Sequence, residues 1–274
     1  MALTWHPAPA KLNLFLHVLS RRADGYHELQ TVFRLIDRAD RVGIAPRRDG
    51  EVRFSGEFGE HNLVVRAAKL LKTETSVRHG CDLALEKTIP VGGGLGGGSS
   101  DAATTLLALN RLWKTGLGAS ELMQIALRLG ADVPFFLLGR NALGEGIGER
   151  LTPIDLPPAW YLVLVPQVSV STKETFASAL TSRGKRLKIP PFLSGQGQND
   201  LEPVVIARYP EVAAQLAWLR QHRPQARMTG SGACVFAEFA TEAEARALHT
   251  QLPGGMNGFV ARGLERHPLH DARD

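Results

Sequence analysis

The stretch from Pro90 to Asn110 reads PVGGGLGGGSSDAATTLLALN and constrains the fold more than any other part of the chain. Six of its first nine residues are glycine. Glycine lets a backbone approach a ligand closely and adopts positive φ angles. A helix that begins beside such a run supplies unpaired N–H donors and the positive end of its dipole. Strand-like residues precede the run and an apolar helical pattern follows it. The stretch therefore predicts a phosphate-holding loop between a strand and a helix, with Ser99 and Ser100 as hydroxyl donors or caps.

Other known glycine motifs fit the run less well. Gly92, Gly94 and Gly97 match the dinucleotide fingerprint G-x-G-x-x-G, but that fingerprint needs a second parallel strand ending in an acid about 20 residues on, and this chain continues as a helix. A Walker A loop needs a lysine after its last glycine, and Ser99 follows Gly98 here. The protein-kinase loop needs a valine where Ser99 stands. A flexible loop or a tight turn remains the alternative.

Length and composition are those of an ordinary globular protein. The 274 residues are enough for one large domain or two, and 44% are apolar and 22% charged. The net charge of +5 includes no Lys/Arg block that would predict nucleic-acid binding, and scattered basic residues suit an anionic small molecule. Cys81 and Cys234 have no metal-ligand spacing and suit a reducing compartment.

The chain shows no sign of export or of strong self-association. No signal peptide is recognisable at its start, and its apolar runs are too short to span a bilayer. We therefore expect a cytoplasmic protein with no membrane partner. Because no heptad pattern or long apolar stripe is present, we expect a monomer or a weak homodimer.

Hydrophobic periodicity predicts an α+β chain. Alternation predicts strands over 11–19 and 27–36, with Leu29, Thr31 and Phe33 on one side of the second. An Asp-Gly pair at 49–50 between two strand-like segments predicts a hairpin turn. Further strands are expected over 81–90, 160–167, 233–239 and 258–264.

Helical spacing and prolines divide the rest of the chain. Helices are expected over 63–72, 99–113, 120–129, 172–180, 201–222 and 242–252, with a short element opening at Pro134 and a polar loop over 181–197. Asn62 is expected to cap the first helix, and Ser120 with Glu121 the third. Prolines cluster in TPIDLPP over 152–158, which favours a boundary between domains of residues 1–155 and 156–274.

The glycine run resembles the ATP loop of the GHMP kinase superfamily, which includes galactokinase, homoserine kinase and mevalonate kinase. The shared pattern is Pro-x-Gly-x-Gly-Leu-Gly-x-Gly-Ser-Ser-x-Ala. PAKLNLFLHV near the start resembles the first motif of that family, and RMTGSGACVFAEF resembles its third. RADGYHELQTVF and GADVPFF resemble further motifs of one branch of the family. Together with the three motifs above, they occur in the order found in that branch and extend over nearly the whole chain. The resemblance implies an N-terminal ribosomal-protein-S5-domain-2-like ATP-binding domain and a C-terminal ferredoxin-like α/β sandwich that binds the substrate.

That branch transfers the γ-phosphoryl group of ATP to the 2-hydroxyl of 4-diphosphocytidyl-2-C-methyl-D-erythritol, in the non-mevalonate route to isoprenoid precursors. The resemblance implies that Asp132 is the catalytic base and that Lys11 is its electrostatic partner. From the residues alone, a helix cap ahead of Pro134 is the favoured role for Asp132, and an ordinary surface position is the commoner one for Lys11. Mg²⁺ is expected with ATP, its protein ligands unassigned. We expect Asp101 to act through the helix dipole rather than through the metal.

The resemblance also assigns two groups of binding residues. Asn13 would position the substrate, Tyr26, His27 and Phe176 would hold its cytidine, and Thr172 would hydrogen-bond it; Phe176 is equally a candidate core residue. Gly230–Gly232 would let backbone approach the site, or form a tight turn. The expected ATP-binding residues are Asn62, Leu63, Pro90, Gly92, Gly93, Gly94, Leu95, Gly96, Gly97, Gly98, Ser99 and Ser100.

Two other functions remain open from the sequence. Another GHMP kinase, of the homoserine or mevalonate branch, would share the ATP loop but lack RADGYH. A non-catalytic nucleotide-binding domain would need neither Lys11 nor Asp132.

Overall fold

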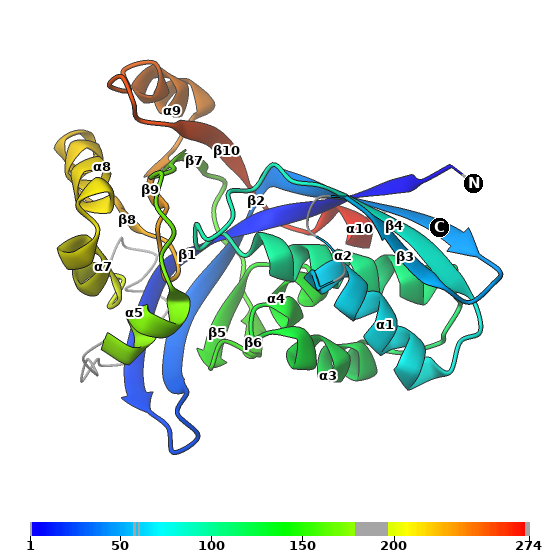
Figure 1. Cartoon of the computed structure of the whole chain (residues 1–274). Coiled ribbons are helices and arrows are strands. Elements are labelled where there is room, and N and C mark those ends of the chain that lie inside the picture. The colour runs from blue at the N-terminus through cyan, green and yellow to red at the C-terminus, as the bar shows by residue number, and fades with distance from the viewer. Residues whose placement is uncertain (1, 57–58, 60, 179–196, 272–274) are drawn as a thin grey trace.

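Two long antiparallel strands run through the whole molecule and join its two lobes (Figure 1). The computed structural model describes residues 2–56, 59, 61–178 and 197–271. The strands are β1 (Thr4–Arg21) and β2 (His27–Arg47). They confirm the strands predicted over 11–19 and 27–36 and extend beyond them, because shifts of register bend the ladder without ending it.

The other strands extend this pair into one mixed sheet. Its path runs β3-β4-β2-β10-β7-β9-β8, while β1 and β5 also pair with β2, and β6 pairs with β5. The bounds are β3 (Val52–Ser55), β4 (Gly80–Glu86), β5 (Ala142–Gly146), β6 (Arg150–Pro153), β7 (Trp160–Leu164), β8 (Arg227–Met228), β9 (Val235–Phe239) and β10 (Gly258–Leu264).

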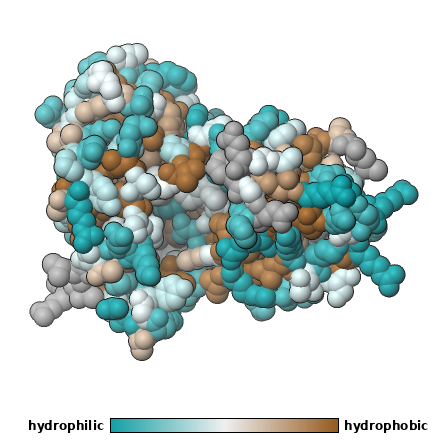
Figure 2. Space-filling view, viewed as in Figure 1, coloured by the Kyte–Doolittle hydropathy of each residue, from teal (hydrophilic) through white to brown (hydrophobic). Residues whose placement is uncertain are grey.

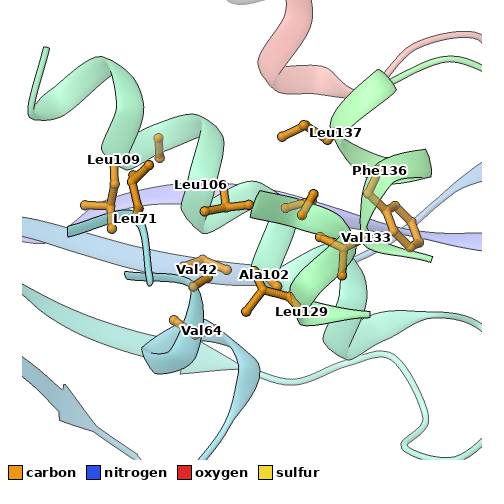
Figure 3. Close-up of a cluster of buried hydrophobic side chains, with 14 of the residues drawn as sticks. Val42, Val64, Leu71, Ala102, Leu106, Leu109, Leu129, Val133, Phe136 and Leu137 are labelled. Carbon is orange, nitrogen blue, oxygen red and sulfur yellow. The ribbon is translucent and has the colours of Figure 1, made fainter. Parts of the chain in front are cut away.

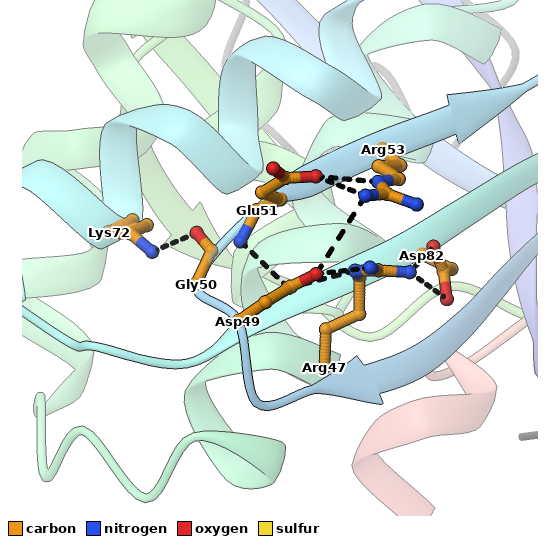
Figure 4. Close-up of polar contacts among 7 residues, drawn as sticks. All are labelled: Arg47, Asp49, Gly50, Glu51, Arg53, Lys72 and Asp82. Atoms are coloured by element: carbon orange, nitrogen blue, oxygen red, sulfur yellow. Dashed lines mark hydrogen bonds and ion pairs between the residues drawn. The ribbon is translucent and has the colours of Figure 1, made fainter.

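The hairpin predicted at Asp49 and Gly50 is wrong. β3 pairs in parallel with β4, and β4 lies between β2 and β3. The chain therefore makes a wide turn that side chains hold (Figure 4). Arg47 bonds Asp49 and Asp82, with Nη1 2.9 Å from Oδ1 of Asp82, and Lys72 donates to the carbonyl of Gly50. The Asp-Gly pair marks a turn correctly, but only the later pairing of β4 decides which strand β3 joins.

Four helices and the sheet face they cover enclose the core of the first lobe. They are α1 (Leu63–Thr75), α2 (Gly97–Leu112), α3 (Ala119–Leu129) and α4 (Val133–Leu138). Buried residues at helical spacing on α2, including Ala102, Leu106 and Leu109, meet Leu71 from α1 and Val42 from β2 (Figure 3). The helix predicted after the glycine run is thus confirmed, and this core fixes the direction of its axis.

The structure confirms one of the predicted helix caps and corrects the others. The Asn62 side chain accepts a hydrogen bond from the Val65 N–H at 3.0 Å, so the predicted cap is present. Helix α2 begins before Ser99, with Gly96 at its N-cap position and no side-chain cap. Helix α3 begins before Ser120; Gly118 is its N-cap, and Glu121 accepts from the Gly118 N–H at 2.8 Å.

The second lobe places helices beside β7, β8, β9 and β10. They are α5 (Thr172–Ser178), α7 (Glu202–Arg208), α8 (Pro210–His222) and α9 (Glu242–His249). Most of the loop predicted over 181–197 lies outside the described residues. None of the helices in the described ranges is long and apolar enough to cross a membrane.

The C-terminal end returns to the first lobe. β10 pairs with β7 and also with β2, and α10 (Pro268–Asp271) follows it. His267 is buried, and its Nε2 lies 3.3 Å from the hydroxyl of Thr104 on α2. The last residues of the chain thus pack against the first predicted domain. The predicted domain boundary between residues 155 and 156 stays a prediction.

Candidate active site

The glycine run forms a loop that only glycine can follow at several points. Gly92, Gly94 and Gly96 have φ angles of +73°, +76° and +72°, which L side chains rarely adopt. A Cβ atom at Gly94 would collide with the carbonyl oxygen of Thr229. The Lys11 N–H donates to the Leu95 carbonyl at 3.0 Å and ties the loop to β1. Close packing and a backbone hydrogen bond thus hold the loop against β1 and the second lobe.

The third glycine motif packs directly on this loop. The Cys234 N–H donates to the Gly93 carbonyl at 3.1 Å, and a Cβ atom at Gly93 would lie 2.6 Å from the Cys234 sulfur. Gly230 approaches Gly94 so closely that its own Cβ would lie 2.9 Å from the Gly94 carbonyl. Backbone from the second lobe thus reaches the glycine loop, as the sequence predicts for Gly230–Gly232.

The start of α2 presents backbone donors next to the loop. Gly96 is its N-cap, and the first intrahelical bond described here runs from the Ser100 N–H to the Gly96 carbonyl at 2.9 Å. The N–H groups of Gly97, Gly98 and Ser99 have no place in the helical ladder. Unpaired N–H groups at the positive end of a helix dipole bind phosphate.

A cavity of about 540 Å³ opens beside the loop, and the face that Figure 2 shows is hollowed between the two lobes. Most of the residues predicted to bind ATP or substrate line it. They are Lys11, Asn13, Asn62, Leu63, Pro90, Gly92, Gly93, Gly94, Leu95, Gly96, Gly97, Gly98, Ser99, Asp132, Thr172 and Phe176.

Three predicted residues do not line the cavity. Ser100 is fully buried, and its hydroxyl donates to the Pro9 carbonyl at 2.7 Å. Tyr26 is 59% exposed in the turn between β1 and β2. His27 is buried and stacks on Phe176, with ring centroids 5.4 Å apart and planes inclined by 29°. Since Phe176 lines the cavity, His27 lies directly behind its wall.

Lys11 and Asp132 meet in the cavity. The Lys11 Nζ lies 3.5 Å from Oδ2 of Asp132. The lysine side chain is 3% exposed, so the alternative of a surface lysine is wrong, and the aspartate is 33% exposed. Asp132 occupies the N-cap position of α4, but its side chain makes no capping hydrogen bond. The carboxylate therefore faces the lysine and the cavity rather than the helix.

The surroundings of Lys11 hold its side chain in place. Its Nζ donates to the side-chain oxygen of Asn13, whose Nδ2 donates to the Thr31 hydroxyl at 2.8 Å, and the ammonium lies 5.7 Å from the Phe33 ring centroid. Burial lowers the pKa of Lys11, and the charge of Asp132 opposes that shift. Leu29, Thr31 and Phe33 all line the cavity, which confirms that they share one side of β2.

A second lysine, which the sequence reasoning missed, reaches the cavity below the glycine loop. Lys87 forms ion pairs with Asp40 and with Asp101, whose Oδ2 lies 2.8 Å from the lysine Nζ. Asp40 also accepts from the Ile89 N–H at 2.8 Å. Asp101 is buried in this ion pair, a contact that the expected helix-dipole role did not include. Burial raises the pKa of Asp101, against the opposing charge of Lys87.

A glycine loop with unpaired helix N–H groups, beside a paired lysine and aspartate, suits phosphoryl transfer, which depends on positioning and charge stabilisation. The family model described as GHMP kinases N terminal domain matches residues 62–140, and the model described as GHMP kinases C terminal matches residues 178–257. The chain belongs to the GHMP kinase family. It is an ATP-dependent small-molecule kinase.

Relatives that match nearly the whole chain carry one enzyme name. The chain is 61% identical over 272 residues to the 4-diphosphocytidyl-2-C-methyl-D-erythritol kinase of Nitrosospira multiformis, covering 97% of this chain and 92% of the relative. It is 58% identical over 270 residues to the enzyme of the same name from Thiobacillus denitrificans, covering 97% of each.

Solved structures agree with this relationship. A crystal structure of 4-(cytidine 5'-diphospho)-2C-methyl-D-erythritol kinase superposes with a TM-score of 0.87 at 36% identity, covering 95% of this chain and 99% of that chain. A homoserine kinase from Cytophaga hutchinsonii superposes with a TM-score of 0.71 at 17% identity, covering 97% of this chain and 96% of that one. The second likeness shows the shared fold alone.

Proposed function

We propose that this kinase transfers the γ-phosphoryl group of ATP to the 2-hydroxyl of 4-diphosphocytidyl-2-C-methyl-D-erythritol. The identity of 52–61% to relatives of that name supports the substrate. The observation that carries the mechanism is the contact between Lys11 and Asp132 at one side of the cavity, with the glycine loop beside it.

We propose that the glycine loop holds the triphosphate. The N–H groups of Gly97, Gly98 and Ser99 would bind its oxygens, and Asn62 and Leu63 would border the adenine. Ser100 would act through the position of its backbone, since its hydroxyl is bonded to Pro9. Lys87 would keep the start of α2 in register through Asp40 and Asp101 and add positive charge below the phosphates.

The transfer step would use the lysine–aspartate pair. The acceptor oxygen attacks the γ-phosphorus while Asp132 takes the hydroxyl proton. A new oxygen–phosphorus bond forms as the bond to the β-phosphate oxygen breaks, and ADP leaves with that electron pair. The charge of Lys11 would stabilise the negative charge that develops on the transferred group.

We propose that Mg²⁺ accompanies ATP. In the described part of the chain, no group of three or more His, Cys, Asp or Glu side chains is arranged to hold a metal. Mg²⁺ bound through one or two carboxylates and phosphate oxygens needs no such group. Asp101 and Asp132 are the carboxylates that line the cavity, and Oδ1 of Asp101 has no hydrogen-bond partner within the described residues. When bound, the ion would neutralise phosphate charge.

The substrate would extend toward the second lobe. Phe176 stacks on the His27 ring and would offer an aromatic face for cytosine. Tyr26, which precedes His27 in the turn between β1 and β2, is exposed. The Thr172 hydroxyl lies 2.8 Å from the Ser231 hydroxyl. Thr172 would bind the diphosphate or the polyol of the substrate, and Asn13 would bind it nearer the reacting hydroxyl. We also propose that a domain boundary lies near residue 155. We propose that the protein is cytoplasmic and is a monomer or a weak homodimer.

A substrate panel tests the proposed function. ADP release would be followed with 4-diphosphocytidyl-2-C-methyl-D-erythritol, homoserine and mevalonate, and ³¹P NMR would locate the new phosphate on the product. Activity with the cytidine compound alone, at its 2-hydroxyl, is expected. Turnover of homoserine or mevalonate would instead support another branch of the family, and no turnover of any alcohol would support a binding domain.

A further inference from the structure

A second cavity, of about 520 Å³, lies on the other side of the β1–β2 pair from the catalytic cavity. Leu14 from β1 and Arg34 from β2 line it, whereas Lys11, Asn13 and Phe33 from the same strands line the catalytic cavity. Its remaining walls come from β7, β8, β9 with the residue after it, and the segments 156–158 and 223–226. We call it the Arg34 cavity. Its size is within the range of small-molecule sites.

Arg34 is the unusual residue of this cavity. Its side chain is only 1% exposed, although it carries a permanent positive charge. Its Nε and Nη1 atoms have no hydrogen-bond partner within the described residues. Leaving a buried charge unpaired costs several kcal/mol, so buried arginines are nearly always paired with an acid or an anion. A cavity beside the unpaired guanidinium provides room for such an anion.

A second, half-buried arginine faces the same space. Arg227 lines the cavity; its Nη1 donates to the Gly197 carbonyl at 3.1 Å, while its Nε has no partner in the described ranges. Burial and the neighbouring carboxylate of Glu238 raise the pKa of the Tyr161 hydroxyl, and the charges of Arg34 and Arg227 oppose that shift. The two guanidinium groups and the phenol therefore converge on one region.

The balance of charge in the cavity favours an anion. Arg223 also lines it but is engaged at the rim, 4.0 Å from Glu244 and over the Phe239 ring. Glu238 is the acid that lines the cavity; it is exposed and acts on Tyr161 and Arg227, so one carboxylate faces the two arginines. The buried Arg34, the half-buried Arg227 and the phenol match the charge and oxygen geometry of a phosphate group better than those of a single carboxylate.

We propose that the Arg34 cavity is a second ligand site, which binds a phosphate group on the guanidinium groups of Arg34 and Arg227. The apolar wall formed by Leu14, Leu156 and Pro157 suits a short hydrocarbon attached to that phosphate. The site is separate from the catalytic cavity and does not depend on the identity of the kinase substrate. The phosphate can be free or esterified, and both forms use the same two arginines.

Thermal unfolding with an occupied active site tests the proposal. A saturating non-hydrolysable ATP analogue removes binding at the glycine loop from the measurement. Inorganic phosphate and butyl phosphate would then be titrated against the wild type, Arg34→Met and Arg41→Met. Arg41 is an exposed arginine of the same strand, paired with Glu86 at 2.9 Å, so its variant removes the same charge outside the cavity.

We expect either compound to raise the unfolding midpoint of the wild type and of Arg41→Met by a few degrees, and to leave that of Arg34→Met unchanged. A lower half-saturating concentration for butyl phosphate identifies an ester as the ligand, and equal values identify free phosphate. An equal rise in Arg34→Met overturns the proposal. If that variant does not fold, wild-type crystals soaked in selenate decide: anomalous density at the Arg34 guanidinium supports the site, and its absence at saturation overturns it.

Discussion

The ammonium nitrogen of Lys11 lies 3.5 Å from a carboxylate oxygen of Asp132, although β1 supplies the lysine and the residue before α4 supplies the aspartate. The lysine is shielded from solvent while the aspartate is partly open to the cavity. A substrate hydroxyl can therefore reach the carboxylate without separating the pair. In the proposed mechanism, the fold itself therefore supplies the electrostatic partner of the base.

The charge of Lys11 should set an alkaline limit on activity. Because burial lowers its pKa from the ordinary 10.5, the ammonium loses its proton at a lower pH than a free lysine does. The value of kcat/KM should therefore fall as pH rises, with a midpoint below 10.5. In Lys11→Arg the residual activity should lose this limb, because guanidinium stays charged. An unchanged limb in Lys11→Arg would assign it to another group.

The shape of the glycine loop should depend on Gly94 far more than on Gly98. Gly94→Ala forces an L residue to φ +76° and a Cβ atom into the Thr229 carbonyl, so we expect a loss of about 1–3 kcal/mol in the free energy of unfolding. Gly98→Ala is the matched control, because its Cβ would meet only Leu63 Cδ1 at 3.4 Å. Denaturant titrations of both variants measure the difference. Equal stabilities would show that the loop is not held as described.

Phe176 should matter for the cytidine substrate and not for ATP. Stacking of a base on an aromatic ring contributes about 1–3 kcal/mol, so Phe176→Leu should raise the KM for the cytidine substrate about tenfold or more. The KM for ATP should stay the same. Phe259→Leu, on β10 and away from the cavity, is the control and should change neither constant. If Phe176→Leu left both values unchanged, the ring would be only a packing residue.

His267 should make the fold sensitive to acid. Burial lowers its pKa to about 3 from 6.5, and its Nδ1 accepts from the Leu269 N–H at 3.2 Å. Between these values the unfolded chain binds a proton that the folded chain does not, so stability present above pH 6.5 is lost as pH falls. The slope is up to about 1.4 kcal/mol per pH unit for one proton.

Unfolding free energies of the wild type and His267→Asn between pH 7 and pH 5 measure this effect. The variant should be less stable at pH 7 but should lose less stability on acidification. Parallel curves for the two proteins would show that His267 does not titrate on unfolding.

Local sequence patterns predicted the helices and strands well, but they did not predict every pairing between strands. The strands at the start of the chain and the helix after the glycine run follow from alternation and helical spacing, and the buried faces of α2 and β2 confirm that reasoning. The hairpin at Asp49 was predicted from the turn alone. It is wrong because β4, which comes later in the chain, takes the place beside β2. Such a choice depends on contacts that no short pattern contains.

The site shows the same limit. The glycine loop and Asn62 could be predicted because backbone conformation and capping are local properties. The contact between Lys11 and Asp132 came from family resemblance, since spacing in the sequence carries no signal for it. Lys87 was missed for the same reason: its partners, Asp40 and Asp101, lie on other elements, and a lysine at the end of a strand is usually a surface residue.

The most direct test of the catalytic account is the single-turnover rate of Asp132→Asn with ATP and 4-diphosphocytidyl-2-C-methyl-D-erythritol. The substitution keeps the size of the side chain and removes the base, so we expect phosphoryl transfer to slow by about 10²–10⁴-fold. The circular dichroism spectrum and the affinity for an ATP analogue should match those of the wild type. A correctly folded Asp132→Asn that transfers phosphate at the wild-type rate would contradict the account.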